Sequence, residues 1–260
     1  MKKIIALSAA GLLGMSVFAG TASAAEGAAA AHHEIEHQVW SFGGFKGQFD
    51  KAQLQRGFQV FKEVCSTCHA LSLVNFRNLT ELGYSEEEVK AFAAGYNVTD
   101  GPNDAGDMFD RPGQPFDRFP SPFPNENAAA AANGGKAPPD LSLMAKARAG
   151  GPDYIYSLLT GYEEAPADVQ VPDGGHYNVS FPGHIIAMPP PLSDDQVTYA
   201  DGTPATVSQM ANDVAQFLVW AAEPTLEERK ATGLKVLLFL VVLSALTFAL
   251  KRKVWADVPH

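Results

Sequence analysis

Two cysteines and a histidine stand together at Cys65, Cys68 and His69, in the order Cys-x-x-Cys-His. This spacing is the pattern of covalent c-type haem attachment. Within one helical turn both thiols can reach the vinyl groups along one porphyrin edge, while the adjacent imidazole can ligate the iron. A zinc site would need further cysteine or histidine ligands at matched spacing, and the chain has no second cysteine pair. A redox-active dithiol would need a βαβ context that the sequence does not show. We therefore expect one covalently bound haem c.

A histidine-ligated iron takes a sixth ligand or keeps an open site, and this choice separates an electron carrier from a ligand-binding haem. Met188 is the favoured ligand because it precedes Pro189–Pro191, a stiff run that would hold an extended loop against the haem. A thioether ligand favours ferrous iron and raises the reduction potential. Met108, His176 and His184 remain alternative ligands.

Haem propionates are anionic and need compensation where they are not fully in water. Arg148 is a candidate partner, since it is the only arginine between the preceding loop and the last predicted exported helix. Tyr154 could add a hydroxyl donor. On residue type alone, a lone arginine is more often a solvated surface group.

Both ends of the chain carry targeting signals. Residues 1–24 have a basic start, an apolar run and a small-residue cleavage site, the pattern of a signal peptide that is removed. A predicted transmembrane helix at 231–252 ends on the basic run Lys251–Lys253, and basic residues mark the cytoplasmic side of a span. The expected organisation is a single-pass protein of the inner (cytoplasmic) membrane with a periplasmic domain at 25–230 and a cytoplasmic tail at 253–260.

The predicted exported domain is strongly acidic. Of the chain's 19 basic and 29 acidic residues, 13 and 28 lie in residues 25–230, which gives that domain a net charge of about −15. Such a field repels nucleic acid and attracts basic partners at rates that fall with salt. An acidic surface can equally serve solubility alone, so charge by itself does not identify a partner.

Apolar periodicity and capping residues predict a mostly helical domain. Asp50 and Gln53 indicate a capping box, and Leu54, Phe58 and Phe61 share one face of the helix that leads to the cysteines. Further helices are expected at 85–95, 141–147 and 153–160, from Pro204 to about Ala222, and from Thr225 into the membrane span. Residues 99–139 and 166–191 are expected to be long loops, and strand signals are sparse.

Several stretches resemble one family at residue level. They are RGFQVFKEVCSTCHAL, DGPNDAGDMFDRPG, APPDLSLMAKARAGGPDYIYSLLTGY, AMPPPL and DGTPATVSQMANDVAQFLVWAAEP, followed by a C-terminal anchor. Together they resemble the cytochrome c1 family, the haem subunits of the ubiquinol–cytochrome c oxidoreductase (cytochrome bc1) complex. The resemblance covers essentially all of the chain after the signal peptide. It implies a class I cytochrome c-like haem domain with long loop insertions and one C-terminal transmembrane helix.

The resemblance also implies roles for individual residues. These are thioether attachment at Cys65 and Cys68, axial ligation by His69 and Met188, contact with a propionate for Arg148 and Tyr154, and lining of the haem for Asn133 and Pro139. Many bacterial members carry an extra disulfide in the loop before the methionine. This chain cannot form it, because both of its cysteines are assigned to the haem.

The activity that the resemblance implies is electron relay from a Rieske iron–sulfur protein to a soluble or tethered cytochrome c. The partners would be cytochrome b, those two proteins and membrane lipid, in a dimeric complex that translocates protons; nucleic acid is not expected. Two other functions use the same motifs: a free-standing tethered electron carrier, and an enzyme whose open haem site binds small ligands. Carbon monoxide binding by the reduced protein would favour the second.

Overall fold

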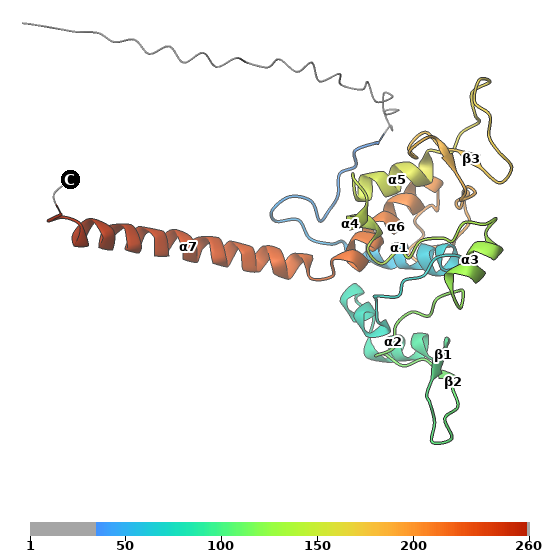
Figure 1. Cartoon of the computed structure of the whole chain (residues 1–260), viewed down its shortest axis with the longest axis horizontal. Helices are drawn as coiled ribbons and strands as arrows, with labels where there is room; N and C mark the ends of the chain where they lie inside the picture. The colour runs from blue at the N-terminus through green and yellow to red at the C-terminus, as the bar shows by residue number, and fades with distance from the viewer. Residues whose placement is uncertain (1–34, 259–260) are drawn as a thin grey trace, which may run out of the picture. The chain divides into compact units, whose positions relative to one another are not determined.

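Helices make up most of the regular structure. The computed structural model describes residues 35–258, so the predicted signal peptide lies outside the described residues (Figure 1). The helices are α1 (Lys51–Glu63), α2 (Glu86–Ala93), α3 (Glu126–Ala132), α4 (Met144–Ala147), α5 (Pro152–Thr160), α6 (Val207–Ala222) and α7 (Leu226–Val254), with 3-10 helices η1 (Cys65–Thr67) and η2 (Phe76–Leu82). Two antiparallel pairs join β1 (Asn97–Asp100) to β2 (Phe109–Pro112) and β3 (His176–Tyr177) to β4 (Ile185–Ile186). The predicted class, mostly α with an apolar C-terminal helix, is confirmed.

Helix α1 begins at the predicted cap. The Asp50 carboxylate accepts hydrogen bonds from the backbone N–H groups of Ala52 and Gln53, which satisfies two of the free donors at the helix start. The Gln53 side chain does not complete a capping box, because its amide donates to Asn212 of α6 instead. The capping prediction was therefore right for the aspartate and wrong for the glutamine, whose contact joins two helices.

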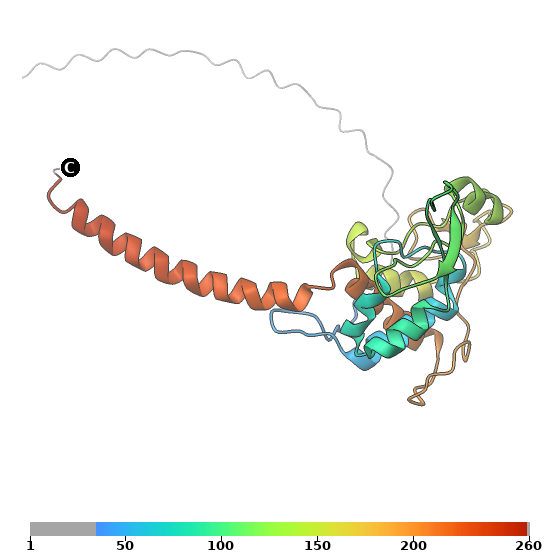
Figure 2. The ribbon, with the colours of Figure 1, turned by 90° about the horizontal axis from the view of Figure 1, so that it is seen from below.

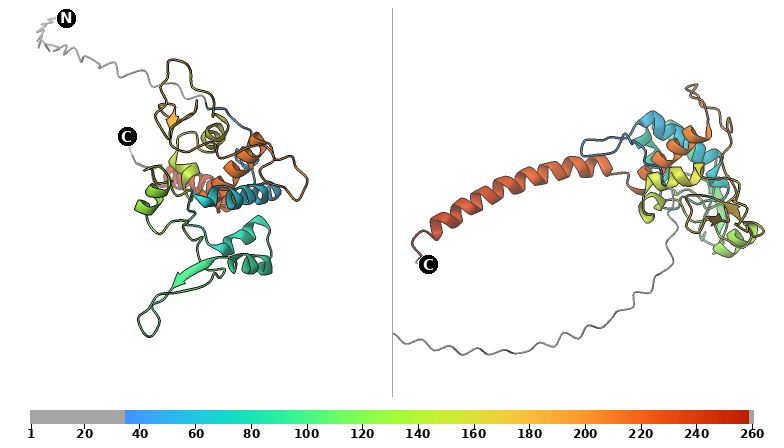
Figure 3. Two further views of the ribbon diagram at one scale, coloured as in Figure 1. Left: turned by 90° about the vertical axis from the view of Figure 1, so that its right-hand side faces the viewer. Right: turned by 90° about the horizontal axis from the view of Figure 1, so that it is seen from above.

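Helices α1 and α6 lie side by side and form the centre of the domain (Figures 1 and 3). Their contact is close because Gly57 has no side chain: a Cβ there would lie 2.1 Å from the Asp213 carbonyl oxygen and 2.8 Å from the Phe217 Cβ. The rings of Phe58 and Phe61 each lie 5.6 Å from that of Phe217. Burial of these aromatic side chains holds α1, and hence the cysteines that follow it, against α6.

A buried ion pair joins the same two helices. The Arg56 Nε lies 3.0 Å from the Asp213 Oδ2, and the Asp213 side chain has no exposed surface. Burial raises the pKa of the Asp213 carboxyl, although hydrogen bonds from Arg56 and Gln209 oppose this shift. Burial thus outweighs pairing in setting the pKa of this carboxyl, and loss of Arg56 would leave a buried carboxylate without its ion-pair partner.

Parts of the predicted loop at 99–139 are ordered elements. β1 and β2 form a hairpin braced by Arg111, whose guanidinium contacts both Asp100 and Asp117 at 2.5 Å. The alanine run forms α3, which Asn125 caps by accepting a hydrogen bond from the Ala128 N–H. The loop prediction was wrong at these two places, because the prolines and glycines around them outweighed short, weak element signals. The 3-10 helix η2 was also not predicted.

Helix α6 begins later than predicted. Its N-cap is Thr206, whose hydroxyl accepts a hydrogen bond from the Gln209 N–H, and Pro204 lies two residues before this cap. The Val207 N–H donates to the Asp194 Oδ1 at 2.8 Å. A carboxylate from outside the helix therefore helps to fix where α6 starts, and local pattern alone does not contain that contact.

Helix α7 is long and apolar enough to cross a membrane. Its 29 residues span about 43 Å, compared with a hydrocarbon core of about 30 Å. Its most apolar window has a mean hydropathy of 2.4, and none of that window is buried within the described chain. Thr225 stands at the N-cap position, but its side chain makes no capping hydrogen bond. The basic run Lys251–Lys253 occupies the last turn, as predicted.

Adding a methyl group at the α1–α6 contact should destabilise the fold. We expect Gly57→Ala to lower the free energy of unfolding by about 2–3 kcal/mol, because the Cβ meets backbone rather than a flexible side chain. Thermal unfolding followed by circular dichroism measures the change. The matched control is Gly233→Ala in α7, where nothing lies within 4 Å of the added Cβ. Equal melting temperatures for the two variants would contradict this account of the contact.

Candidate haem site

The two cysteines lie on a tight turn directly after α1. The backbone N–H groups of Cys68 and His69 both donate to the Cys65 carbonyl oxygen, at 3.1 and 2.9 Å. Both thiols are free and half-buried. Burial raises the pKa of the Cys65 thiol to about 12, whereas a redox-active dithiol needs a lowered thiol pKa. Within residues 35–258 no three His, Cys, Asp or Glu side chains gather as a candidate metal cluster.

His69 is held in one tautomer by a backbone carbonyl. Its Nδ1 lies 2.8 Å from the Pro139 oxygen, and because a carbonyl only accepts, Nδ1 must carry the proton. The Nε2 lone pair is then free to ligate a metal. Burial lowers the pKa of His69, although the Pro139 hydrogen bond opposes this, and the neutral imidazole is favoured. The side chain is therefore prepared as a ligand in both charge and orientation.

Residues 139–142, which we call the clasp, hold this arrangement together. The Leu141 N–H donates to the Ala70 carbonyl oxygen at 2.9 Å. The Ser72 backbone N–H and hydroxyl donate to the Asp140 Oδ2 at 3.0 and 2.5 Å. The clasp thus lies beside the segment that follows His69. Backbone and side-chain hydrogen bonds with the clasp together hold that segment in place.

A second set of contacts surrounds the predicted methionine ligand. The Tyr162 hydroxyl donates to the Met188 carbonyl oxygen at 3.1 Å. Burial raises the pKa of Tyr162, with a smaller contribution from nearby Tyr154, so the hydroxyl stays protonated. Burial also raises the pKa of Tyr154, and the positive charge of Arg148 opposes that shift. Arg148 ends α4 and acts on Tyr154 of α5, while Tyr162, two residues after α5, binds the Met188 carbonyl.

The remaining predicted residues lie in different settings. Asn133 ends α3, and its side-chain amide donates to the Ala129 carbonyl oxygen at 2.7 Å. Met108 lies in the β1–β2 connection with 60% of its surface exposed, which does not suit a buried iron ligand. His176 lies in β3, and the His184 Nδ1 is 3.3 Å from the Asn178 carbonyl oxygen.

Two functional features escaped the sequence analysis. Tyr162 was not singled out, because nothing in its neighbourhood marks a tyrosine that holds a loop 26 residues away. The carbonyl of Pro139 as the acceptor for His69 was also missed, since every residue has a carbonyl and only the fold selects one. The requirement for some acceptor could have been stated, because metal-ligating histidines almost always donate their other ring nitrogen.

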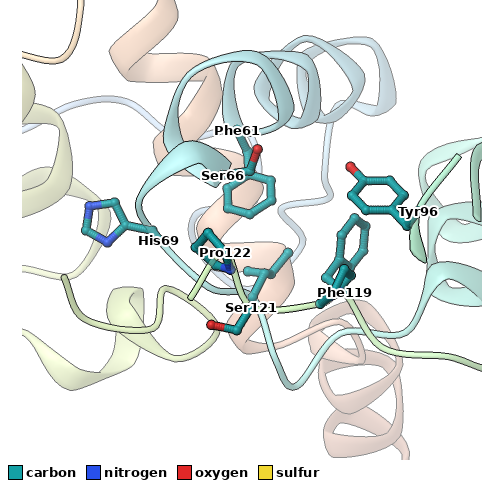
Figure 4. A pocket seen from close by; sticks show the side chains of 9 residues that line it. Phe61, Ser66, His69, Tyr96, Phe119, Ser121 and Pro122 are labelled. Atoms are coloured by element: carbon teal, nitrogen blue, oxygen red, sulfur yellow. The ribbon is translucent and has the colours of Figure 1, made fainter. Parts of the chain in front are cut away.

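A cavity of about 180 Å³ adjoins the cysteine turn, and its lining includes Ser66 and His69 as well as Phe61, Tyr96 and Phe119. Figure 4 shows that the His69 ring points away from the rings of Phe61, Tyr96 and Phe119. His69 nevertheless belongs to the lining of this cavity, so the cavity reaches the cysteine turn itself.

Comparison with known proteins decides the family. The cytochrome C1 family matches residues 40–258. The chain belongs to the cytochrome c1 family. A cytochrome c1 of Rhodospirillum rubrum is 54% identical over 271 residues, covering 98% of this chain and 97% of its own. The mitochondrial cytochrome c1 1 heme protein of Arabidopsis thaliana is 49% identical over 253 residues, covering 96% of this chain and 81% of its own.

A third relative is longer. The cytochrome b/c1 protein of Bradyrhizobium diazoefficiens is 55% identical over an alignment of 240 residues that covers 84% of this chain and 35% of that protein. The resemblance stated from sequence stretches alone is therefore confirmed. Members of the cytochrome c1 family are haem subunits of the cytochrome bc1 complex and take part in electron transfer.

The residues of this cytochrome c1 family member fit a covalent haem. Cys65 and Cys68 offer two free thiols three residues apart, and His69 offers a neutral imidazole whose Nε2 is not used by the Pro139 contact. This donor set has the chemistry that c-type attachment needs. The fit rests on the described geometry of the turn and the clasp.

The clasp should weaken in acid and on loss of its carboxylate. Burial alone would raise the pKa of the Asp140 carboxyl, but hydrogen bonds from Ser142 and Ser72 outweigh it and hold the pKa below the ordinary value. The carboxylate therefore stabilises the fold above about pH 4, and this contribution is lost as the pH falls through the lowered pKa.

We expect Asp140→Asn to lower the free energy of unfolding by about 1 kcal/mol at pH 7, a modest value because the carboxylate is partly solvent-exposed. The difference from the unsubstituted protein should shrink between pH 5 and the acid limit. Denaturant unfolding at several pH values measures it. A difference that stays constant over that range would contradict the charge-based role of Asp140.

Proposed function

We propose that this chain is the haem-carrying, electron-relaying subunit of a membrane quinol–cytochrome c reductase. The observation that carries the proposal is the His69 imidazole, fixed by Pro139 as a neutral ligand beside two free thiols in a chain of the cytochrome c1 family. No side chain in this site needs to act as an acid, a base or a nucleophile. The chain alone relays electrons, and the proton-translocating reductase activity belongs to the assembled complex.

We assign one covalent haem c to this site. The proposed roles are thioether attachment at Cys65 and Cys68, axial ligation by His69 and Met188, compensation of a propionate by Arg148 and Tyr154, and lining of the haem by Asn133 and Pro139. The bound haem supplies reversible one-electron exchange. Tyr162 supports this assignment, because its bond to the Met188 carbonyl gives the methionine loop a rigid attachment without a disulfide.

The proposed partners are a Rieske iron–sulfur protein as donor, a soluble or tethered cytochrome c as acceptor, and cytochrome b within a dimeric complex. A relative named cytochrome b/c1 supports the association with cytochrome b. Purification in mild detergent separates this function from that of a free-standing tethered carrier. The subunit should be purified together with a b-type cytochrome and an iron–sulfur protein. Purification of the subunit without these proteins would contradict the proposal.

The proposed location is the inner membrane, with α7 as a single span and the haem domain in the periplasm. The signal peptide at 1–24 would direct residues 25–230 outward, and the basic run Lys251–Lys253 would hold the tail at 253–260 in the cytoplasm. The length and exposure of α7 support this placement of the anchor at 231–252.

Loss of the methionine thioether should lower the reduction potential. We expect Met188→Leu to reduce the potential of the haem by on the order of 0.2 V, within the range of about 0.8 V that axial ligands span. A redox-titrated optical spectrum of the detergent-solubilised complex measures it. The reduced variant should also bind carbon monoxide, since the sixth position is then open.

The matched control for this measurement is Met108→Leu, which replaces an exposed methionine in the β1–β2 connection and should leave the potential unchanged. A potential unaffected by Met188→Leu would contradict ligation by Met188. A lower reduction potential in Met108→Leu alone would instead indicate that Met108 is the sixth ligand.

Acidic residues near the Met188 loop should increase the rate of association with a basic cytochrome c. Glu163 and Glu164 are exposed and directly follow Tyr162, which contacts the Met188 loop. We expect the double variant Glu163→Gln and Glu164→Gln to lower the association rate roughly two- to fivefold at low salt and less at high salt. Stopped-flow oxidation of the reduced complex measures the rate.

The exposed pair Glu86 and Glu87 at the start of α2 is the matched control, with both residues changed to glutamine. That variant should keep the original rate. An association rate that does not respond to ionic strength would contradict electrostatic docking altogether.

A further inference from the structure

A short loop before α1 has an apolar ring at its tip. Residues 41–48, which we call the 41–48 loop, are closed by a hydrogen bond from the Gln48 N–H to the Ser41 carbonyl oxygen at 3.1 Å. Gly44 has a φ of +65°, which allows the chain to turn there. At the base, Phe42 is buried and lies 5.2 Å from the Phe49 ring. The base is thus anchored in the domain, whereas the tip is not part of its core.

The loop is tied to the start of α7. The Lys230 ammonium donates to the carbonyl oxygens of Phe42 and Gly47, at 2.5 and 3.1 Å, and so holds both sides of the loop. The Phe49 N–H donates to the Glu227 Oε1 at 2.8 Å. Figures 2 and 3 show the loop, in blue, beside the first turns of α7. These bonds fix the height of the loop along the α7 axis.

At this level along α7, the apolar part of the helix begins. The exposed apolar surface of α7 begins at Leu234, four residues or about 6 Å beyond Lys230. The tip carries Phe45, with 55% of its surface exposed, followed by the exposed Lys46. An aromatic ring beside a lysine is the pairing that membrane interfaces favour, since the ring enters the acyl boundary and the ammonium reaches the headgroups.

We propose that the 41–48 loop is a second membrane contact, with the Phe45 ring in the headgroup and upper acyl region and the Lys46 ammonium at anionic headgroups. The inference rests on the proposed placement of α7 across the bilayer. Continuity with the α7 span favours lipid over a protein partner, because a side chain at this height meets the bilayer surface as soon as α7 enters it.

The test places one fluorophore at a time in the full-length, haem-loaded chain. The variants Phe45→Cys, Met108→Cys and Leu240→Cys are labelled with an environment-sensitive dye and reconstituted in vesicles of phosphatidylcholine and phosphatidylglycerol. Labelling of the unsubstituted chain serves as the blank. Quenching by nitroxide groups on the lipid headgroup or along the acyl chain then reports where each label lies.

The label at position 45 should be quenched by headgroup nitroxide at least twice as strongly as the label at position 108, and the label at position 240 by acyl-chain nitroxide. Lys230→Met should reduce the quenching at position 45, because the loop loses both hydrogen bonds from the Lys230 ammonium. Arg229→Met removes a cation from the same turn, where it pairs with Glu223, and should leave the quenching unchanged.

Quenching at position 240 without quenching at position 45 would overturn the inference while the membrane span stands. Absence of quenching at both positions would overturn the placement of α7 and the loop contact with it. In the purified complex, a label at position 45 shielded from both lipid nitroxide and aqueous iodide would show that a protein covers the loop, which also overturns the lipid contact.

Discussion

The hydrogen bond from His69 Nδ1 to the Pro139 carbonyl is the constraint on which the site depends. It decides which ring nitrogen carries the proton, and therefore which one can bind a metal. It also sets the direction of the ring, which Figure 4 shows pointing away from the aromatic side chains behind the turn. The Asp140 carboxylate also accepts hydrogen bonds from Ser72, and this contact keeps the neighbouring Pro139 carbonyl close to His69.

The α1–α6 contact gives that bond a fixed frame. Gly57 lets the two backbones approach, and the rings of Phe58 and Phe61 pack on Phe217 from the face of α1 that leads to the cysteines. The close packing means that small displacements are costly, because no loose side chain is available to absorb them. The position of the cysteine turn is therefore set by the closely packed contact between α1 and α6.

Sequence reasoning predicted what depends on local pattern. The Cys-x-x-Cys-His spacing, the Asp50 cap and the apolar run of α7 are each contained within a few turns of chain, and the structure has an element at each. What failed depends on distant groups: Asp194 helps to fix where α6 begins, and Arg111 braces a hairpin that no local pattern announced. The backbone carbonyl that binds His69 was the hardest feature to predict, because every residue has a carbonyl and residue type does not distinguish one from another.

The sequence separation of that bond distinguishes two steps of folding. His69 and Pro139 are 70 residues apart, whereas the turn that brings the cysteines together spans only a few. Closing so long a loop is slower than forming a local turn. The cysteine turn can therefore form in a chain whose histidine ring is still free to rotate, and the ring is fixed only when residue 139 reaches it.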